Sequence, residues 1–173
     1  MLTKASIEKY FMAERSESWI FMLIGFLAVA GALICFFAMK GNFYKGMAIP
    51  LVVVGLMLAV VGYTVYKRSP EDIKRNVYAY DMNPGDLKSK EIPRMETVMK
   101  NFMIYRWVEI ALLAAGIFLF FYLKEKPGKE MMRGAGAGLA IMAFLALGAD
   151  YFAEQRGSVY LKELKSFTNK QPG

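Results

Sequence analysis

The chain has 173 residues, of which 56% are hydrophobic and 21% are charged, and its formal net charge is +7. A soluble domain contains fewer apolar residues and about a quarter of charged ones, so this composition excludes an ordinary water-soluble globule. The sequence has no histidine, which excludes His-based catalytic triads and metal or haem sites with histidine ligands. Its single cysteine excludes an intrachain disulfide. We therefore expect no metal site and no cofactor.

Two long blocks in the first half of the chain carry no charge. Ser18 to Met39 is uncharged over 22 positions, and Gly46 to Tyr66 is uncharged over 21. At 1.5 Å per residue, each block is long enough to cross a hydrocarbon core of about 30 Å. Residues 18–66 are therefore predicted to form a transmembrane hairpin.

A second pair of apolar blocks lies further along the chain and is interrupted by charge. Ile110 to Leu123 is uncharged over only 14 positions, and the block reaches spanning length when it begins at Phe102. The last block runs from Met131 to about Ala153. Residues 102–154 are therefore predicted to form a second transmembrane hairpin, and the fold class is expected to be an all-α, polytopic four-helix transmembrane bundle.

The distribution of basic residues predicts the orientation of this bundle. Fifteen lysines and arginines fall in the two terminal segments and in the segment between the hairpins, against six in the two short turns. Basic residues keep short loops on the cytoplasmic side of a membrane. We expect both termini to be cytoplasmic, in a protein of the bacterial inner (plasma) membrane.

The segment 67–101, between the hairpins, is expected to be a cytoplasmic helical hairpin. Ser69 and Pro70 have the pattern of a helix start, with serine as the cap and proline in the first turn. A second helix is predicted to begin near Pro93 and to continue into the third span as far as Leu123. The hairpin either packs beneath the bundle or serves as a docking platform for a protein partner at residues 70–100.

The two ends of the chain are expected to lie at the same membrane surface. Residues 1–17 are amphipathic and are predicted to rest in the headgroup layer, and residues 155–173 are predicted to be a cytoplasmic tail. Aromatic side chains are common anchors at membrane interfaces. The predicted anchors are Tyr10, Phe11, Trp19 and Trp107.

Four ionisable residues fall at membrane depth and form the candidate polar cluster, namely Arg106, Glu109, Asp150 and Glu154. Charges are rare inside a bilayer and normally face the interior of a bundle. Arg106 and Glu109 are three residues apart, so they can meet on one helix face. The cluster is interpreted first as charge pairing that fixes helix register. Its alternatives are a site for a cation, a proton or a lipid headgroup, and acid–base catalysis by Glu109 and Asp150.

Small residues mark the expected contacts between helices. They allow helix backbones to approach closely inside a membrane. They serve either internal packing of the four helices or self-association through the last helix. The residues concerned are Gly55, Ala59 and Gly62 in the second span and Gly134 and Gly138 in the fourth.

The two hairpins share a faint internal repeat. Phe36-Phe37, Lys40 and Lys45 in the first hairpin return with the same spacing as Phe120-Phe121, Lys124 and Lys129 in the second. Trp19 and Trp107 precede these pairs, but Trp107 is four residues nearer its pair than Trp19 is to its own. The pattern fits a parallel duplication of the hairpin. It also fits the aromatic and lysine belts that recur at membrane interfaces without duplication.

These features favour a non-enzymatic membrane protein that acts by association, as an accessory, scaffold or effector subunit, and that forms oligomers. The second hypothesis is an ion channel or pore built by several copies. The third is a membrane-embedded enzyme that uses Glu109 and Asp150. The expected partners are the lipid bilayer, a second copy of the chain and a protein bound at residues 70–100. No nucleic-acid-binding motif accompanies the positive charge, so nucleic acid is not expected as a partner.

Overall fold

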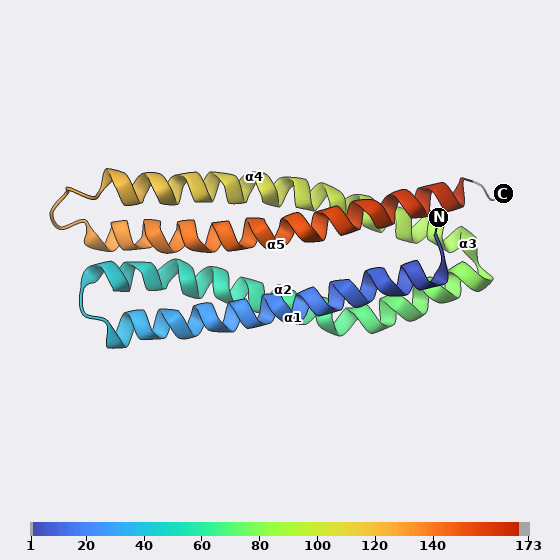
Figure 1. The fold of residues 1–173 in the computed structure, drawn as a ribbon, viewed down its shortest axis with the longest axis horizontal. Helices are drawn as coiled ribbons and strands as arrows, with labels where there is room; N and C mark the ends of the chain where they lie inside the picture. The colour runs from blue at the N-terminus through green and yellow to red at the C-terminus, as the bar shows by residue number, and fades with distance from the viewer. Residues whose placement is uncertain (1, 170–173) are drawn as a thin grey trace.

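The computed structural model describes residues 2–169 and consists of four long helices with short connections (Figure 1). Helix α1 spans Lys4–Leu33 and continues into η1 (Ile34–Ala38), and α2 spans Asn42–Met82. Two short elements follow, α3 (Pro84–Asp86) and η2 (Leu87–Glu91). The chain then forms α4 (Ile92–Tyr122) and α5 (Glu130–Thr168). The predicted all-α class is confirmed, and all four helices are long and apolar enough to cross a membrane.

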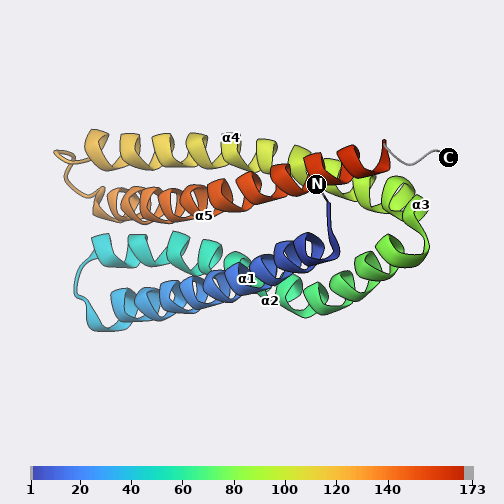
Figure 2. The same ribbon diagram turned by 45° about the vertical axis from the view of Figure 1, so that its right-hand side comes forward.

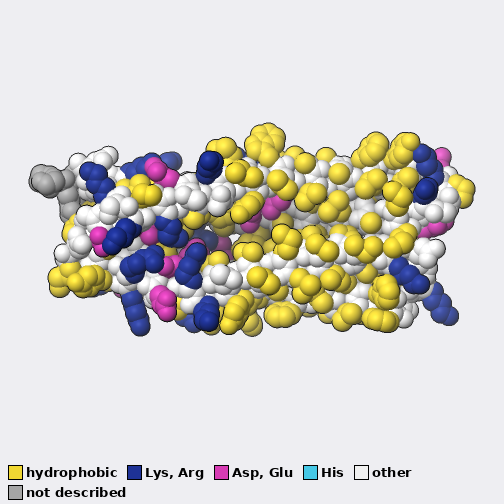
Figure 3. Space-filling model, turned by 180° about the vertical axis from the view of Figure 1, so that it is seen from behind, with side chains coloured by type: hydrophobic (Ala, Val, Ile, Leu, Met, Phe, Trp, Pro, Cys, Tyr) yellow, Lys and Arg dark blue, Asp and Glu magenta, His cyan; other side chains and the backbone are white. Residues whose placement is uncertain are grey.

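The molecule divides along its length into two halves of different chemistry. We call residues 2–17, 67–105 and 155–169 the charged half, and residues 18–66 and 106–154 the apolar half. Figure 3 shows most charged side chains gathered over one end and a smaller group at the opposite end, with a largely hydrophobic surface between them. Most of the large exposed hydrophobic side chains belong to the apolar half, including Phe26, Val60 and Phe118 at more than 60% exposure each.

The hydrophobic core lies in the charged half. It consists of buried side chains from all four long helices, from η2 and from the segment before α1, and they are Leu2, Ile7, Tyr10, Phe11, Ala79, Leu87, Met95, Tyr160 and Leu164. Buried residues of the apolar half are mostly glycine and alanine. A protein that folds in water buries its large apolar side chains. Only the charged half follows that rule, whereas the apolar half reverses it.

In the apolar half the helices lie side by side in the order α1, α2, α5, α4 (Figures 1 and 2). The expected four-helix bundle is therefore an open row here, in which α1 and α4 occupy opposite ends. Each outer helix packs on its own hairpin partner, and α2 and α5 meet in the centre. Hydrocarbon solvates an apolar helix face as well as another helix does, so closure of the row is not required.

The central contact between α2 and α5 depends on glycine. A side chain at Gly46 would collide with the backbone of Met131, and one at Gly134 would collide with the backbone of Phe43. The Gly134–Gly138 pair therefore packs inside one molecule, which leaves this motif unavailable for contact with a second copy. Gly55 and Gly62 pack in the same way against α1, at Gly25, Ser18 and Met22, and a side chain at Gly25 would meet Ala59.

The two hairpins are built on one plan with a spacing of 88 residues. Helices α1 and α4 begin at Lys4 and Ile92, and α2 and α5 begin at Asn42 and Glu130. The same spacing joins Trp19 to Trp107, and it exchanges the two reciprocal contacts, Gly46 on Met131 and Gly134 on Phe43. Helices α2 and α5 run parallel, so this relation is a pseudo-twofold axis along the helices. The phenylalanine pair and the lysines of the sequence repeat return after 84 residues, so they are offset by four positions from this structural relation.

Of the two helix starts expected in the charged half, one is wrong and one is confirmed. Helix α2 does not begin at Ser69-Pro70 but runs through both residues, and Figure 2 shows it changing direction on the way to the charged end. Ser69 is buried, and its hydroxyl group donates to the carbonyl oxygen of Val65 at 2.8 Å instead of capping a new helix. The start expected near Pro93 is confirmed, because α4 begins at Ile92.

The terminal segments are parts of long helices. Tyr10 and Phe11 are buried in the hydrophobic core, where Tyr10 stacks on Tyr160, so they do not reach a headgroup layer as anchors. The expected tail forms the end of α5 as far as Thr168, and Tyr160 and Leu164 lie on its buried face. Met1 and residues 170–173, which the two terminal predictions include, lie outside the described residues.

A pair of glycine substitutions tests the central contact. Alanine normally stabilises a helix by up to about 1 kcal/mol relative to glycine, and Gly148→Ala should do so because no atom lies near its added side chain. Gly134→Ala should destabilise the protein by about 1–3 kcal/mol, because α2 must move away from α5. Thermal unfolding in detergent, followed by tryptophan fluorescence, measures both. A Gly134→Ala protein as stable as the Gly148→Ala protein would contradict the close packing.

Candidate functional site

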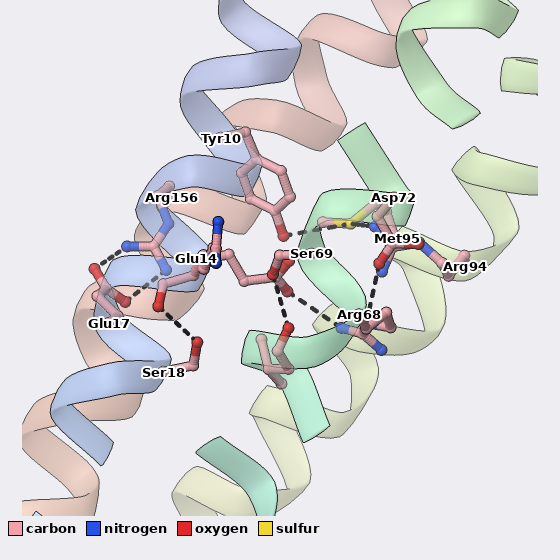
Figure 4. Close-up of polar contacts among 12 residues, drawn as sticks. Tyr10, Glu14, Glu17, Ser18, Arg68, Ser69, Asp72, Arg94, Met95 and Arg156 are labelled. Atoms are coloured by element: carbon pink, nitrogen blue, oxygen red, sulfur yellow. Dashed lines mark hydrogen bonds and ion pairs between the residues drawn. The ribbon is translucent and has the colours of Figure 1, made fainter. Parts of the chain in front are cut away.

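The charged half holds a chain of six alternating charges that joins α1, α2, η2 and α4. The order along it is Glu14, Arg68, Asp72, Arg75, Glu91, Arg94. Asp72 contacts Arg68 at 3.0 Å and Arg75 at 2.8 Å, and Glu91 contacts Arg94 at 2.6 Å. Figure 4 shows part of this chain beside Tyr10 and Met95. The ion pairs fix how the two hairpins meet at this end of the molecule.

Because Asp72 and Glu91 are buried, their carboxylates require the arginine partners. The side chains of Asp72 and Glu91 are only 2% and 3% exposed, so neither carboxylate is solvated by bulk water. An isolated buried charge is very unfavourable, and each of these is offset by two arginines. A separate pair between Glu17 and Arg156 ties α1 to α5 (Figure 4).

Sequence reasoning missed this network. Its acids and arginines lie in segments rich in charge, where a charged residue does not by itself indicate a buried ion pair. The spacing of Arg68, Asp72 and Arg75 at intervals of four and three, and of Glu91 and Arg94 at three, is a helical ion-pair pattern that could have indicated it. The contacts that link one helix to another have no such local signal.

The four predicted cluster residues come together as two pairs between α4 and α5. Arg106 contacts Glu154 through Nη1 at 3.0 Å, and not its expected neighbour Glu109. Glu109 lies next to Asp150, and the two carboxyl groups interact directly. Oε2 of Glu109 is buried without a hydrogen-bond partner among residues 2–169.

The chemistry available at this cluster is narrow. Two adjacent carboxyl groups can hold one proton between them, since a protonated carboxyl donates to an ionised one. Within residues 2–169, no three residues of the types that bind metals are grouped as a metal site.

Trp19 and Trp107, the other two predicted anchors, are both more than half exposed on the outer surface.

Comparison with known proteins supplies no relative: no family model, no curated protein and no solved structure matches this chain. The interpretation therefore depends on the geometry of the residues described above.

Removal of one acid from the six-charge chain tests its contribution to folding. Asp72→Asn leaves Arg68 and Arg75 facing a neutral amide in a buried position. Loss of one partner of a buried pair costs about 3–5 kcal/mol, so thermal stability in detergent should fall sharply. The matched control is Asp86→Asn, which removes an exposed pair with Lys90 and should cost less than about 1 kcal/mol. Equal losses in the two proteins would show that the buried chain adds nothing specific.

Glu14 provides a test by pH. Burial raises the pKa of this carboxyl above its ordinary value of 4.5, against the opposing charge of Arg68. Between 4.5 and the raised pKa the folded state binds more protons than the unfolded state, so stability decreases as the pH rises through that window. The difference in melting temperature between Glu14→Gln and the wild type should therefore shift in favour of the variant as the pH rises from 4.5 to 7.5. The surface substitution Glu71→Gln is the control. A difference that did not depend on pH would contradict the assignment.

Proposed function

We propose that this chain is an integral membrane protein that crosses a bilayer four times and acts by association, with the charged half as its contact domain. The single observation that carries the proposal is the division into two halves. The apolar half turns its large hydrophobic side chains outward, as hydrocarbon requires. The charged half has a buried core, a neutralised ion network and a polar exterior, as water requires.

The excess of basic residues at the charged half supports a cytoplasmic location for it, with both termini on that side. The function itself is best described as that of an accessory or scaffold subunit. The sequence contains no histidine, and residues 2–169 contain no group of metal ligands. What the charged half offers instead is a rigid helical surface.

The contact surface is assigned to the outer face of segment 70–100. Tyr78 and Met82 are 66% and 73% exposed near the end of α2, one helical turn apart. Lys74, Lys88 and Lys90 lie in the same segment and are exposed. Exposed apolar side chains in a segment that also exposes lysines fit a protein partner with a hydrophobic, acidic surface.

An oligomeric pore is the second candidate, and one observation favours it. The carboxyl pair of Glu109 and Asp150 places two acids in the apolar half, and a cation pathway needs such groups. The open row encloses no channel in one molecule, so a pore requires several copies.

Replacement of the exposed side chains tests association. Chemical cross-linking in native membranes, followed by mass spectrometry, should join segment 70–100 to one abundant partner. Tyr78→Ser with Met82→Ser should reduce that product at least about tenfold, because an exposed apolar anchor carries much of a contact's energy. Met12→Ser removes a methionine of similar exposure from α1 and should leave the product unchanged.

Ion release from liposomes distinguishes the oligomeric pore from the scaffold. Purified into liposomes, the wild type should release no trapped ions above the level of empty vesicles. Ion release that is lost in Glu109→Gln, together with unchanged cross-linking in the Tyr78→Ser, Met82→Ser protein, would favour the pore over the scaffold.

A further inference from the structure

A polar pocket opens between α4 and α5 where the apolar half meets the charged half. It is lined by Arg106 from α4 and by Tyr151, Glu154, Gln155 and Ser158 from α5. The four α5 residues follow the helical spacing of three and four positions, so they form one face. The neighbouring helices place a guanidinium, a carboxylate and two hydroxyl groups around one space.

The ion pair in this pocket leaves binding capacity on both partners. Arg106 contacts both oxygens of Glu154 through the single nitrogen Nη1, which leaves Nε and Nη2 without a partner among residues 2–169. The Arg106 side chain is 42% exposed. Tyr151 accepts a hydrogen bond from Gln155 at 3.3 Å, so its own hydroxyl proton is free to donate. The pocket therefore offers donors for an anion beside a carboxylate for a cation.

Its surroundings place this pocket at a membrane surface. Tyr151 lines the pocket and is 55% exposed, and Trp107, which follows Arg106 in α4, is 65% exposed; both residue types favour the interface. An apolar strip continues from Tyr151 along α5 through Gly148 to Phe144, at helical spacing. Gly148 has no atom near its missing side chain, which leaves a gap between the exposed rings of Tyr151 and Phe144.

We propose that this pocket binds the headgroup of a phosphoethanolamine lipid from the surrounding membrane. The phosphate would meet Arg106, the hydroxyl groups of Tyr151 and Ser158 would donate to its oxygens, and the ammonium would meet Glu154. One acyl chain would lie over Gly148. This inference rests on the proposed insertion of the apolar half into a bilayer.

The charge pattern selects this headgroup over its alternatives. A phosphocholine headgroup carries a methylated ammonium that has no N–H to donate to Glu154. A phosphoglycerol headgroup has no cation and leaves its negative charge beside that carboxylate. Only a lipid with both a phosphate and a protonated amine satisfies the two partners.

The other hairpin provides an internal comparison. At the spacing of 88 residues, the pocket residues correspond to Ser18, Tyr63, Tyr66, Lys67 and Pro70. Tyrosine is the one residue type that both positions share, at Tyr63 and Tyr151, with exposures of 58% and 55%. The first hairpin has no guanidinium or carboxylate at these positions, so it should not bind the headgroup.

Native mass spectrometry tests the proposal with the full chain in mild detergent. An equimolar mixture of dioleoyl lipids with phosphoethanolamine, phosphocholine and phosphoglycerol headgroups is the probe. The wild type should retain phosphoethanolamine lipid about tenfold over the other two, the effect of one charged hydrogen bond. Tyr151→Ala and Ser158→Leu should lower the retention of all three lipids, because both side chains donate to the phosphate that the three share, whereas Tyr63→Ala should leave retention unchanged.

The variant Glu154→Gln tests the headgroup assignment most directly. It removes the cation partner and leaves the guanidinium of Arg106 unpaired, so the preference should change to the phosphoglycerol lipid. If this variant does not fold, the wild-type preference still tests the headgroup, and the Tyr151 and Ser158 variants, which both keep the ion pair, test whether the lipid lies in this pocket. Equal retention of the three lipids by the wild type would overturn the proposal. So would equal losses in Tyr151→Ala and Tyr63→Ala.

Two further experiments distinguish a failure of the lipid assignment from a failure of the proposed membrane insertion. A rise in melting temperature with soluble O-phosphoethanolamine, without any retained lipid, would assign the pocket to a free metabolite and overturn the lipid assignment. Extraction of native membranes with alkaline carbonate tests the proposed function: protein that remains in the pellet but shows no headgroup preference refutes this inference alone. Protein released into the supernatant refutes membrane insertion as well.

Discussion

The whole structure depends on which solvent surrounds residues 18–66 and 106–154. In water, the exposed rings of Phe26, Phe118 and Phe144 would drive aggregation or rearrangement. In hydrocarbon there is no hydrophobic penalty for exposing them, and helix contact comes from close packing instead. The proposed membrane location would account for the glycines at the α2–α5 contact and for the open row of helices.

The charged half has the opposite requirement, and it satisfies it with side chains from every long helix. Its core joins the start of α1 to the end of α5 through the stacked rings of Tyr10 and Tyr160. The chain of six charges then links α1 and α2 to η2 and α4. The two hairpins touch along one contact in the apolar half, so this domain is what holds them together at a single geometry.

Much of this arrangement was predictable, since an uncharged apolar block of spanning length is typical of a membrane helix and rare in a soluble protein. The ionisable pairs at membrane depth were predictable because charge is conspicuous there, although their pairing was not: the register between α4 and α5 decides that Arg106 meets Glu154. The burial of Tyr10 and Phe11 was not predictable, because the same amphipathic pattern suits a membrane surface and a protein core. The contact with Tyr160 decides between them, and 150 residues separate the two tyrosines in sequence.

The most direct test measures whether single positions contact hydrocarbon or water. Nitroxide labels are attached to single cysteines in a Cys35→Ser background, and the protein is studied in liposomes by electron paramagnetic resonance. Labels at Val60→Cys and Phe118→Cys should collide frequently with oxygen and rarely with a water-soluble nickel chelate. Labels at Tyr78→Cys and Val159→Cys should show the reverse. Frequent collision of the nickel chelate at Val60 and Phe118 would contradict the account, because those positions would then face water.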